Sequence, residues 1–315
     1  MTRGKRTAAL QVSLLREGIT ESNHSAHAVV CDDKGRVLSA AGDAETATFI
    51  RSSLKPFQAL AVASTGTLER YDLSDRDLAI ICSSHQGTTE QARQVFNILW
   101  RCDIEPKALQ CPVPPGTRSP LQHNCSGKHA GMLAVCQQRH WMKENYLRRN
   151  HPVQQLILTK VAELLRIPPD ELIGVRDDCG APTYYMQLGQ MAALYAQLGS
   201  GDRLDLERIV RAMTHYPELV AGTDKFDTEL MRLSNGQLVS KSGGEGIQCV
   251  GRIGEGMGLA IKVVDGSKRA KYAAAIECLK QLGWITLTMA DILAERFMTL
   301  SEFKRLETSG ELSML

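Results

Sequence analysis

The sequence predicts a mixed α/β fold of the α+β kind, in which strands from both chain ends form one mainly antiparallel sheet around an inserted helical subdomain. Three observations support this. The first sixty residues alternate and turn like β-structure, residues 88–235 have mostly helical periodicity, and short glycine-bounded apolar runs follow. We expect a single domain over residues 1–315, with its sheet part at about 1–87 and 236–315.

The N-terminal part reads as strands followed by a helix. In "AHAVVCDDKGRVLSAAG" the turn residues 33–35 separate two apolar stretches, as in a β-hairpin. Apolar residues at helical spacing then predict a helix over about 54–63, and Pro56 requires this helix to begin close by, because proline is tolerated only in a first turn. The run "LAIICSSHQG" at 78–87 predicts a buried strand that ends in polar residues.

The rest of the chain divides clearly by its periodicity. Helical patterns occupy residues 88–102, 152–167, 183–199 and 268–283. Short β-rich runs bounded by glycine occupy residues 236–244, 246–254 and 256–266. The pattern at 268–283 is the last predicted helix and precedes the end of the chain.

Composition favours small-molecule chemistry over nucleic-acid or membrane binding. The chain has 43% hydrophobic and 23% charged residues and a formal net charge of +2, without a basic tract. Its start lacks the apolar core of a signal peptide, and no segment is apolar enough to span a bilayer, so we expect a cytoplasmic protein. Nine dispersed cysteines fit reduced thiols or a metal site better than a disulfide framework.

The stretch "IRSSLKPFQALAVAS" contains a serine and a lysine three residues apart, Ser52 and Lys55. On a helix these side chains share a face, and the spacing is that of the S-x-x-K motif, in which lysine acts as the base for a serine hydroxyl. A lysine pKa of about 10.4 would have to fall by about three units, at a cost of about 4 kcal/mol, through burial or neighbouring cations. The alternative is an N-capped helix with a snorkelling lysine.

Two further polar sites interrupt apolar runs. Ser83, Ser84 and His85 follow the apolar run at 78–82, where enzymes of mixed fold often keep their chemistry. Lys262 lies inside the apolar run "LAIKVVDG". A lysine there costs free energy unless it is paired or used, which makes it a candidate functional residue.

Two polar loops could bind a metal. "PLQHNCSGKHAGMLAVC" at 120–136 and "GVRDDCGAPT" at 174–183 each supply a cysteine beside other polar side chains, and sulfur and nitrogen ligands suggest zinc. No C-x-x-C pair or deaminase signature is present, so a hydrogen-bonded loop with structural thiols is the alternative. The triplet Lys241-Ser242-Gly243 matches the K-[ST]-G element of serine acyl transferases, but their S-D-N element is absent and a plain turn is equally consistent.

Taken in order, "RSSLKPFQAL", "CSSHQG", "HNCSGKHAGML", "DDCGAPTY" and "KSGGEG…GLAIKVVDG" make the chain resemble the Rhizobium etli type of L-asparaginase. The resemblance covers about residues 45–270. It implies a fold like that of serine β-lactamases and glutaminases, usually as a homodimer. It also implies hydrolysis of L-asparagine to L-aspartate and ammonia by one catalytic domain, without a nucleotide or organic cofactor.

The resemblance also implies roles for particular residues. It pairs Ser52 with Lys55 and Ser84 with Lys262 as catalytic groups. It implies a zinc ion held by Cys125, Lys128 and Cys179, and substrate contacts from Arg51, His129, Asp177, Gly244 and Glu245. Gln86 and Gly244 depart from the family pattern, which has asparagine and alanine there, and bear on substrate contacts or loop shape.

The expected mechanism has Ser52 as nucleophile and Lys55 as base, with Lys262 acting through Ser84 as the acid for ammonia. Ser84 competes with Ser52 for the role of nucleophile. Two rival functions are a penicillin-binding or β-lactamase-like acyl transferase, and a non-catalytic zinc-binding or ligand-sensing protein of the same fold. The sequence does not choose between asparagine and glutamine.

Overall fold

The computed structural model describes residues 7–315 and consists of two compact units. The sheet unit comprises residues up to Ser53, Met186–Gly201 and Glu229–Leu315, and the helical unit comprises Leu54–Tyr185 and Asp202–Thr228. Each contains segments that are distant in sequence. The division into one catalytic domain with the predicted boundaries stays a prediction.

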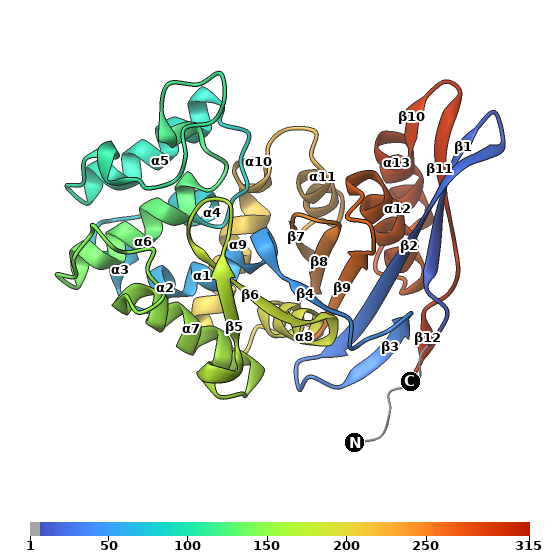
Figure 1. Ribbon diagram of the computed structural model, residues 1–315, viewed down its shortest axis with the longest axis horizontal. Helices are drawn as coiled ribbons and strands as arrows, with labels where there is room; N and C mark the ends of the chain where they lie inside the picture. Colours follow the sequence, from blue (N-terminus) through green and yellow to red (C-terminus); the bar gives the residue numbers. More distant parts are fainter. Residues whose placement is uncertain (1–6) are drawn as a thin grey trace. The chain divides into compact units, whose positions relative to one another are not determined.

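The sheet unit is built on a nine-stranded sheet in the order β10-β11-β1-β2-β9-β8-β7, to which β3 and β12 add through β2. All neighbouring strands with a described register are antiparallel, and strands from both chain ends meet at the β1–β11 and β2–β9 pairs. The strands are β1 (Leu10–Arg16), β2 (Ile19–Asp32), β3 (Val37–Ala41), β7 (Leu238–Ser242), β8 (Ile247–Arg252), β9 (Met257–Val263), β10 (Thr299–Ser301), β11 (Lys304–Ser309) and β12 (Ser313–Met314), with the short β4 (Ala47–Phe49) outside this sheet. Figure 1 shows the early and late strands side by side.

Helices cover the central strands of this sheet. Consecutive residues of β8 and β9 are buried, so both faces of these strands are covered. α8 (Leu188–Gly199) and α12 (Lys268–Gln281) pack on them, and α13 (Leu287–Phe297) packs on α12. α8 lies so close that a Cβ atom on Gly258 would be 2.1 Å from the carbonyl oxygen of Ala192, which explains the glycine in β9.

The helical unit surrounds α6, whose residues are buried from Ser126 to Cys136. A helix that is buried on every side belongs at the centre of a unit, and α2, α3, α4, α5 and α7 all pack on α6. The elements of the unit are α1 (Lys55–Gln58), α2 (Leu60–Ala63), α3 (Thr67–Arg70), α4 (Asp75–Ile81), α5 (Thr89–Arg101), α6 (Ser126–Gln138), α7 (Pro152–Leu165), α9 (Leu204–His215), α10 (Pro217–Val220), β5 (Ile173–Arg176) and β6 (Pro182–Gln187), the last ending in the sheet unit. α11 (Phe226–Leu233) crosses the boundary between the units.

The mixed fold class and the antiparallel sheet from both chain ends are confirmed, but three local predictions are wrong. Residues 78–81 are the end of helix α4, which a Ser74–Asp77 capping box starts, and not a strand. Residues 183–187 are strand rather than helix, and α13 with β10 to β12 follows the helix predicted to be last. The first error has a simple cause, since a short apolar run does not distinguish a buried strand from a buried helix.

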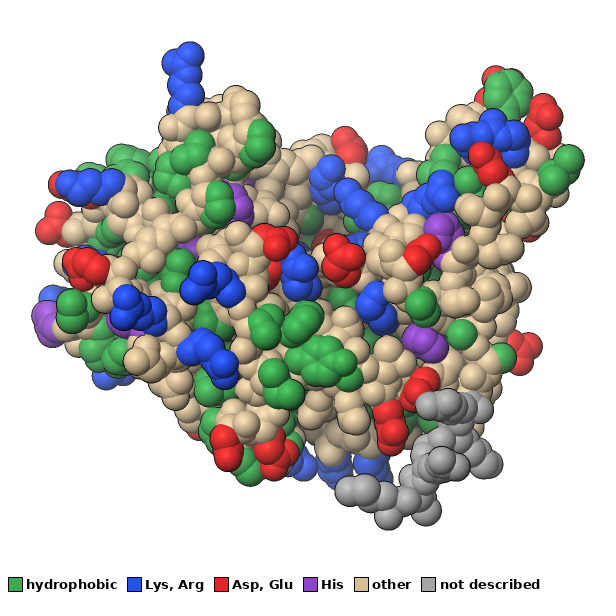
Figure 2. Space-filling view, in the orientation of Figure 1, with side chains coloured by type: hydrophobic (Ala, Val, Ile, Leu, Met, Phe, Trp, Pro, Cys, Tyr) green, Lys and Arg blue, Asp and Glu red, His purple; other side chains and the backbone are tan. Residues whose placement is uncertain are grey.

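Basic and acidic side chains are interspersed on the face drawn in Figure 2, in keeping with the near-neutral composition. None of the helices between residues 7 and 315 is both long and apolar enough to cross a membrane.

Candidate active site

Lys55 is the most deeply buried charged group among the predicted site residues. It begins α1 directly after the 3₁₀ turn η1 (Arg51–Leu54), and Pro56 occupies the first turn, as predicted. Its Nζ atom donates to the carbonyl oxygens of Ser83 (2.6 Å) and Asn124 (3.2 Å) and to Ser84 Oγ (2.9 Å). Burial lowers the pKa of Lys55, and the nearby Lys128 ammonium lowers it further, although Cys125 acts in the opposite direction.

The segment Ser83–Gly87 leaves the end of α4 and carries Ser84 to Lys55. The backbone N–H of Ser84 donates to the carbonyl oxygen of Val220 (2.8 Å), which holds the segment in place. His85 Nδ1 accepts from the Gly87 N–H (3.0 Å), so Nε2 carries the proton and donates to Ser126 Oγ (2.8 Å). Burial, followed by the charge of Lys55, lowers the pKa of His85 to about 3, so this histidine is neutral and structural.

Cys125, Lys128 and Cys179 come together around the first turn of α6. Cys125 precedes the helix and Lys128 lies on its buried first turn, while the β5–β6 turn supplies Cys179. A hydrogen bond from Cys179, together with the Lys55 and Lys128 ammonium groups, lowers the pKa of Cys125 well below that of a free thiol. The same hydrogen bond raises the pKa of Cys179. The two pKa shifts favour the thiolate form at Cys125 and the thiol form at Cys179.

This donor set fits a zinc ion. Burial alone would lower the pKa of Lys128, but the sulfur atoms outweigh it and raise the pKa, so without metal the lysine is a cation. Zinc prefers sulfur and nitrogen ligands, and an amine can serve only when neutral. In the described part of the chain no three His, Cys, Asp or Glu side chains form a metal cluster, so Lys128 would have to complete the set. All nine cysteines are free and buried.

Asp177 and His129 lie beside this cluster. Asp177 opens the β5–β6 turn, where its backbone N–H donates to the Ala181 carbonyl oxygen (2.9 Å) and Gly180 has a positive φ of 87°. His129 follows Lys128 on α6, is fully buried, and has its Nδ1 atom 2.6 Å from the hydroxyl oxygen of Tyr146. The metal-ligand candidates and these two substrate-contact candidates thus belong to one region of the helical unit.

The sheet unit holds a second group of predicted residues. A Cβ atom on Gly244 would lie 3.6 Å from Arg51 Cζ, so Arg51 faces the β7–β8 turn. In this turn Glu245 and Gly246 have positive φ values of 52° and 73°, and the Ile247 N–H donates to the Gly244 carbonyl oxygen (3.2 Å). Lys271 of α12 donates to the Gly243 carbonyl oxygen (2.8 Å), and this hydrogen bond ties the turn to α12.

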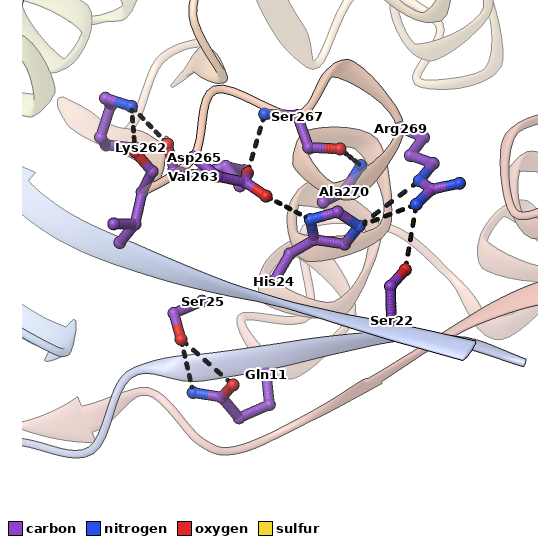
Figure 3. Close-up of polar contacts among 11 residues, drawn as sticks. Gln11, Ser22, His24, Ser25, Lys262, Val263, Asp265, Ser267, Arg269 and Ala270 are labelled. Atoms are coloured by element: carbon purple, nitrogen blue, oxygen red, sulfur yellow. Dashed lines mark hydrogen bonds and ion pairs between the residues drawn. The ribbon is translucent and has the colours of Figure 1, made fainter. Parts of the chain in front are cut away.

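Lys262 lies on β9 near an ion-pair network that Figure 3 shows. Its Nζ atom donates to the carbonyl oxygens of Val263 and Val264. Burial lowers the pKa of Lys262, while Glu245 and Asp265 act in the opposite direction. Asp265 Oδ2 is 2.6 Å from His24 Nδ1, and Arg269 donates to the other ring nitrogen of His24, which fixes the proton on Nδ1 (Figure 3).

Of the two adjacent serines, Ser53 is committed to structure. It is fully buried, its hydroxyl donates to the Lys241 carbonyl oxygen (3.0 Å), and its own carbonyl accepts from Tyr195 Oη (2.8 Å). Ser52 is half-buried in η1. Ser53 is therefore occupied in holding the backbone, and the catalytic role of Ser52 stays a prediction. Lys241 is fully buried and donates to the Ser242 carbonyl oxygen (2.9 Å).

The structure brings one member of each predicted catalytic pair together, since Lys55 contacts Ser84. The pairings of Ser52 with Lys55 and of Ser84 with Lys262 each combine residues of two units, and they stay predictions. Sequence reasoning missed Tyr146, the Asn124 carbonyl and Lys271. Only Lys271 had a signal, because it shares a helical face with Ala274, Ala275 and Cys278, which are buried.

A buried lysine with a lowered pKa that donates to a serine hydroxyl is an arrangement found in enzymes that use a nucleophile and a base. The comparison with family models identifies the family. The chain belongs to the L-asparaginase II family, whose model matches residues 12–314, and this supports hydrolysis of amides.

No curated protein matches the chain. Among solved structures, Mglu in its native form at 4.3 M NaCl has 15% sequence identity and a TM-score of 0.40, over 83% of this chain and 62% of that chain. A putative beta-lactamase from Bacteroides dorei has 12% identity and a TM-score of 0.39, over 83% of this chain and 89% of that one. This chain thus spans about three fifths of the length of the first, and likeness at these TM-scores carries no argument about function.

Proposed function

We propose that the protein is an L-asparaginase that hydrolyses the side-chain amide of L-asparagine to L-aspartate and ammonia. The observation that carries the proposal is the environment of Lys55 in a chain of this family. The lysine is fully buried, its pKa is lowered, and its Nζ atom lies 2.9 Å from Ser84 Oγ. A lysine whose pKa is lowered by burial can act as a general base.

In the proposed reaction Lys55, as the neutral amine, removes the hydroxyl proton of Ser52 while Ser52 Oγ attacks the amide carbon. The C–N bond then breaks, and the leaving nitrogen takes a proton from Lys262 through Ser84 and departs as ammonia. Water then attacks the aspartyl ester and gives a proton to Lys262 through Ser84, while Lys55 returns its proton to the Ser52 oxygen as the ester bond breaks, which restores the serine and both lysines. Backbone N–H groups of the 242–246 turn stabilise the oxyanion, and Arg51 with Asp177 binds the substrate's charged groups.

Cys125, Lys128 and Cys179 would hold the zinc ion. When bound, zinc supplies a fixed positive charge that can polarise a substrate oxygen. These residues also have a structural role without metal, because the thiolate of Cys125 and the ammonium of Lys128 offset each other's charge inside the unit. We further propose that the protein is cytoplasmic and that it forms a homodimer. Light scattering on the purified protein would test the homodimer.

The acyl-transferase alternative is less well supported. The Lys241-Ser242-Gly243 triplet matches its K-[ST]-G element, but its S-D-N element is absent from the sequence. Acylation by a fluorescent penicillin would favour this alternative.

Ammonia release from L-asparagine and L-glutamine tests the proposal. Wild type should release ammonia from asparagine, and Ser52→Ala and Lys262→Met should each lose the activity, whereas the adjacent Ser53→Ala should affect stability first. Each protein is assayed with and without a chelator. A reactive asparagine analogue, mapped by mass spectrometry, should modify Ser52. Full activity of Ser52→Ala, or an adduct on Ser84, would overturn the assignment of the nucleophile, and inactivity of the wild type toward both amides would overturn the function.

A further inference from the structure

Tyr146 and His129 form a buried hydrogen-bond chain that nothing in the proposed reaction yet uses. Tyr146 is fully buried, and its hydroxyl oxygen accepts from the backbone N–H of Gln110 (3.0 Å) and lies 2.6 Å from His129 Nδ1. The two rings meet edge to face, with centroids 5.6 Å apart. All of these residues belong to the helical unit.

The direction of this chain follows from counting donors. A phenol has one O–H to donate, and the Gln110 N–H already fills one acceptor position of its oxygen. His129 Nδ1 is the acceptor within reach of that O–H, so Tyr146 donates and Nδ1 carries no proton. In neutral histidine the proton then resides on Nε2. Within residues 7–315, His129 Nε2 is buried and has no hydrogen-bond partner.

A buried N–H group without an acceptor costs about 1–3 kcal/mol, so its presence in a fully buried side chain points to a ligand that supplies the acceptor. The charges nearby indicate which kind. Lys128, which precedes His129 on α6, and Lys55 of the same unit are both buried lysines. A carboxylate oxygen fits this donor best, because it accepts strongly and carries negative charge.

We infer that Tyr146 is a positioning residue that fixes His129 as an Nε2–H donor to a carboxylate oxygen of the bound amino acid. This rests on the proposed function and adds a role for His129 and a new residue, Tyr146. It also removes His129 from the possible metal ligands in this state, because a protonated Nε2 has no free electron pair for a metal.

Nitrogen NMR on protein labelled with ¹⁵N-histidine tests the inference without any activity. The His129 resonances, assigned by their loss in His129→Gln, should show a protonated Nε2 and a bare Nδ1. L-Aspartate, the probe, should shift the Nε2–H resonance. In Tyr146→Phe the Nδ1 resonance should change. A protonated Nδ1 in wild type, or no shift with saturating aspartate, would overturn the inference.

Steady-state kinetics supply the second measurement. Loss of one hydrogen bond to a charged group should raise KM on the order of 10- to 100-fold in His129→Leu, with a smaller change in kcat. His129→Gln places an amide N–H near the Nε2 position and should stay within a fewfold of wild type. Tyr146→Phe should raise KM several-fold, whereas Tyr184→Phe, which removes another buried hydroxyl of the same unit, should not.

Equal KM values for Tyr146→Phe and wild type would overturn the positioning role. If wild type releases no ammonia from asparagine, the proposed function fails, but the NMR measurement still decides whether Tyr146 sets the proton on Nε2 and whether a carboxylate binds there. The two failures are therefore distinguishable.

Discussion

Replacement of Lys55 by methionine removes the ammonium group and leaves a side chain of similar length in the same buried position. Three acceptors lose their donor, namely the carbonyl oxygens of Ser83 and Asn124 and the half-buried Ser84 hydroxyl. The Ser83 carbonyl is buried, so its lost donor costs about 1–3 kcal/mol in folding free energy, whereas Asn124 is exposed and water can replace the donor to its carbonyl. Removal of the buried charge stabilises the folded state by several kcal/mol, and burial of the apolar methionine stabilises it by about 1.5–3 kcal/mol more.

The gains at least offset this cost, so Lys55→Met should remain folded. Its activity should fall much further, because loss of a general base lowers kcat about 10²- to 10⁴-fold. The measurements are kcat for ammonia release and the urea midpoint of the same preparation.

Lys160→Met in α7 is the matched control, because it removes an ammonium from the same unit whose ion pair with Glu163 (3.3 Å) lies at the surface. Exposed pairs contribute about 0–1 kcal/mol, so this variant should keep wild-type activity and stability. If Lys55→Met kept more than about a tenth of wild-type kcat while folded, the role of Lys55 as base would be refuted.

Three further predictions concern the helical unit. Gly127→Ala should destabilise the protein by about 1–3 kcal/mol in urea titrations, because the new Cβ would lie 1.9 Å from the Ile80 carbonyl oxygen and force α6 away from α4, whereas Gly189→Ala, with 3.7 Å to its nearest atom, should be neutral or stabilising; equal stability of the two variants would contradict this packing. The pKa of His85 falls from 6.5 to about 3 on folding, so the folded state binds fewer protons and the free energy of unfolding decreases as the pH falls below 6.5. Between pH 8 and pH 5 this decrease should be about 2 kcal/mol larger in wild type than in His85→Gln. The same decrease in both proteins would show that His85 is protonated in the native state. Cys179→Ser should lower the zinc content measured by atomic emission at least tenfold, and acidification should release zinc from wild type as the ligands take up protons; full retention in the variant would exclude Cys179 from the ligand set.

The sequence predicted those parts of the fold that depend on local pattern. Gly35, with a positive φ of 82°, makes the β2–β3 turn where the turn residues predicted it, and α5, α7 and α12 lie where the periodicity places them. β11 was not predicted, because Leu306 is its one buried residue and its alternation of apolar and polar residues is weak. The strand forms because it pairs with β1.

The candidate site was predictable where side chains themselves carry the signal. The spacing of Ser52 and Lys55 and the two cysteine-bearing loops were visible in the sequence. The structure places Cys125, Lys128 and Cys179 close together, and their role as zinc ligands stays a prediction. Ser84 was also visible, but as the end of a strand, whereas it follows helix α4.

The sequence by itself thus determined which residue types and turns are available: the S-x-x-K spacing, the proline that starts α1 and the glycines of the turns. Only the tertiary structure decided which groups meet. Lys55 donates to the carbonyl oxygens of Ser83 and Asn124. Every residue has a backbone carbonyl, so the sequence cannot indicate which of them will accept these bonds. Tyr146 reaches His129 across 17 residues because the packing around α6 brings them together. The hydrophobic periodicity that predicts a helix or strand follows from backbone geometry over a few residues. These contacts depend instead on how whole helices pack.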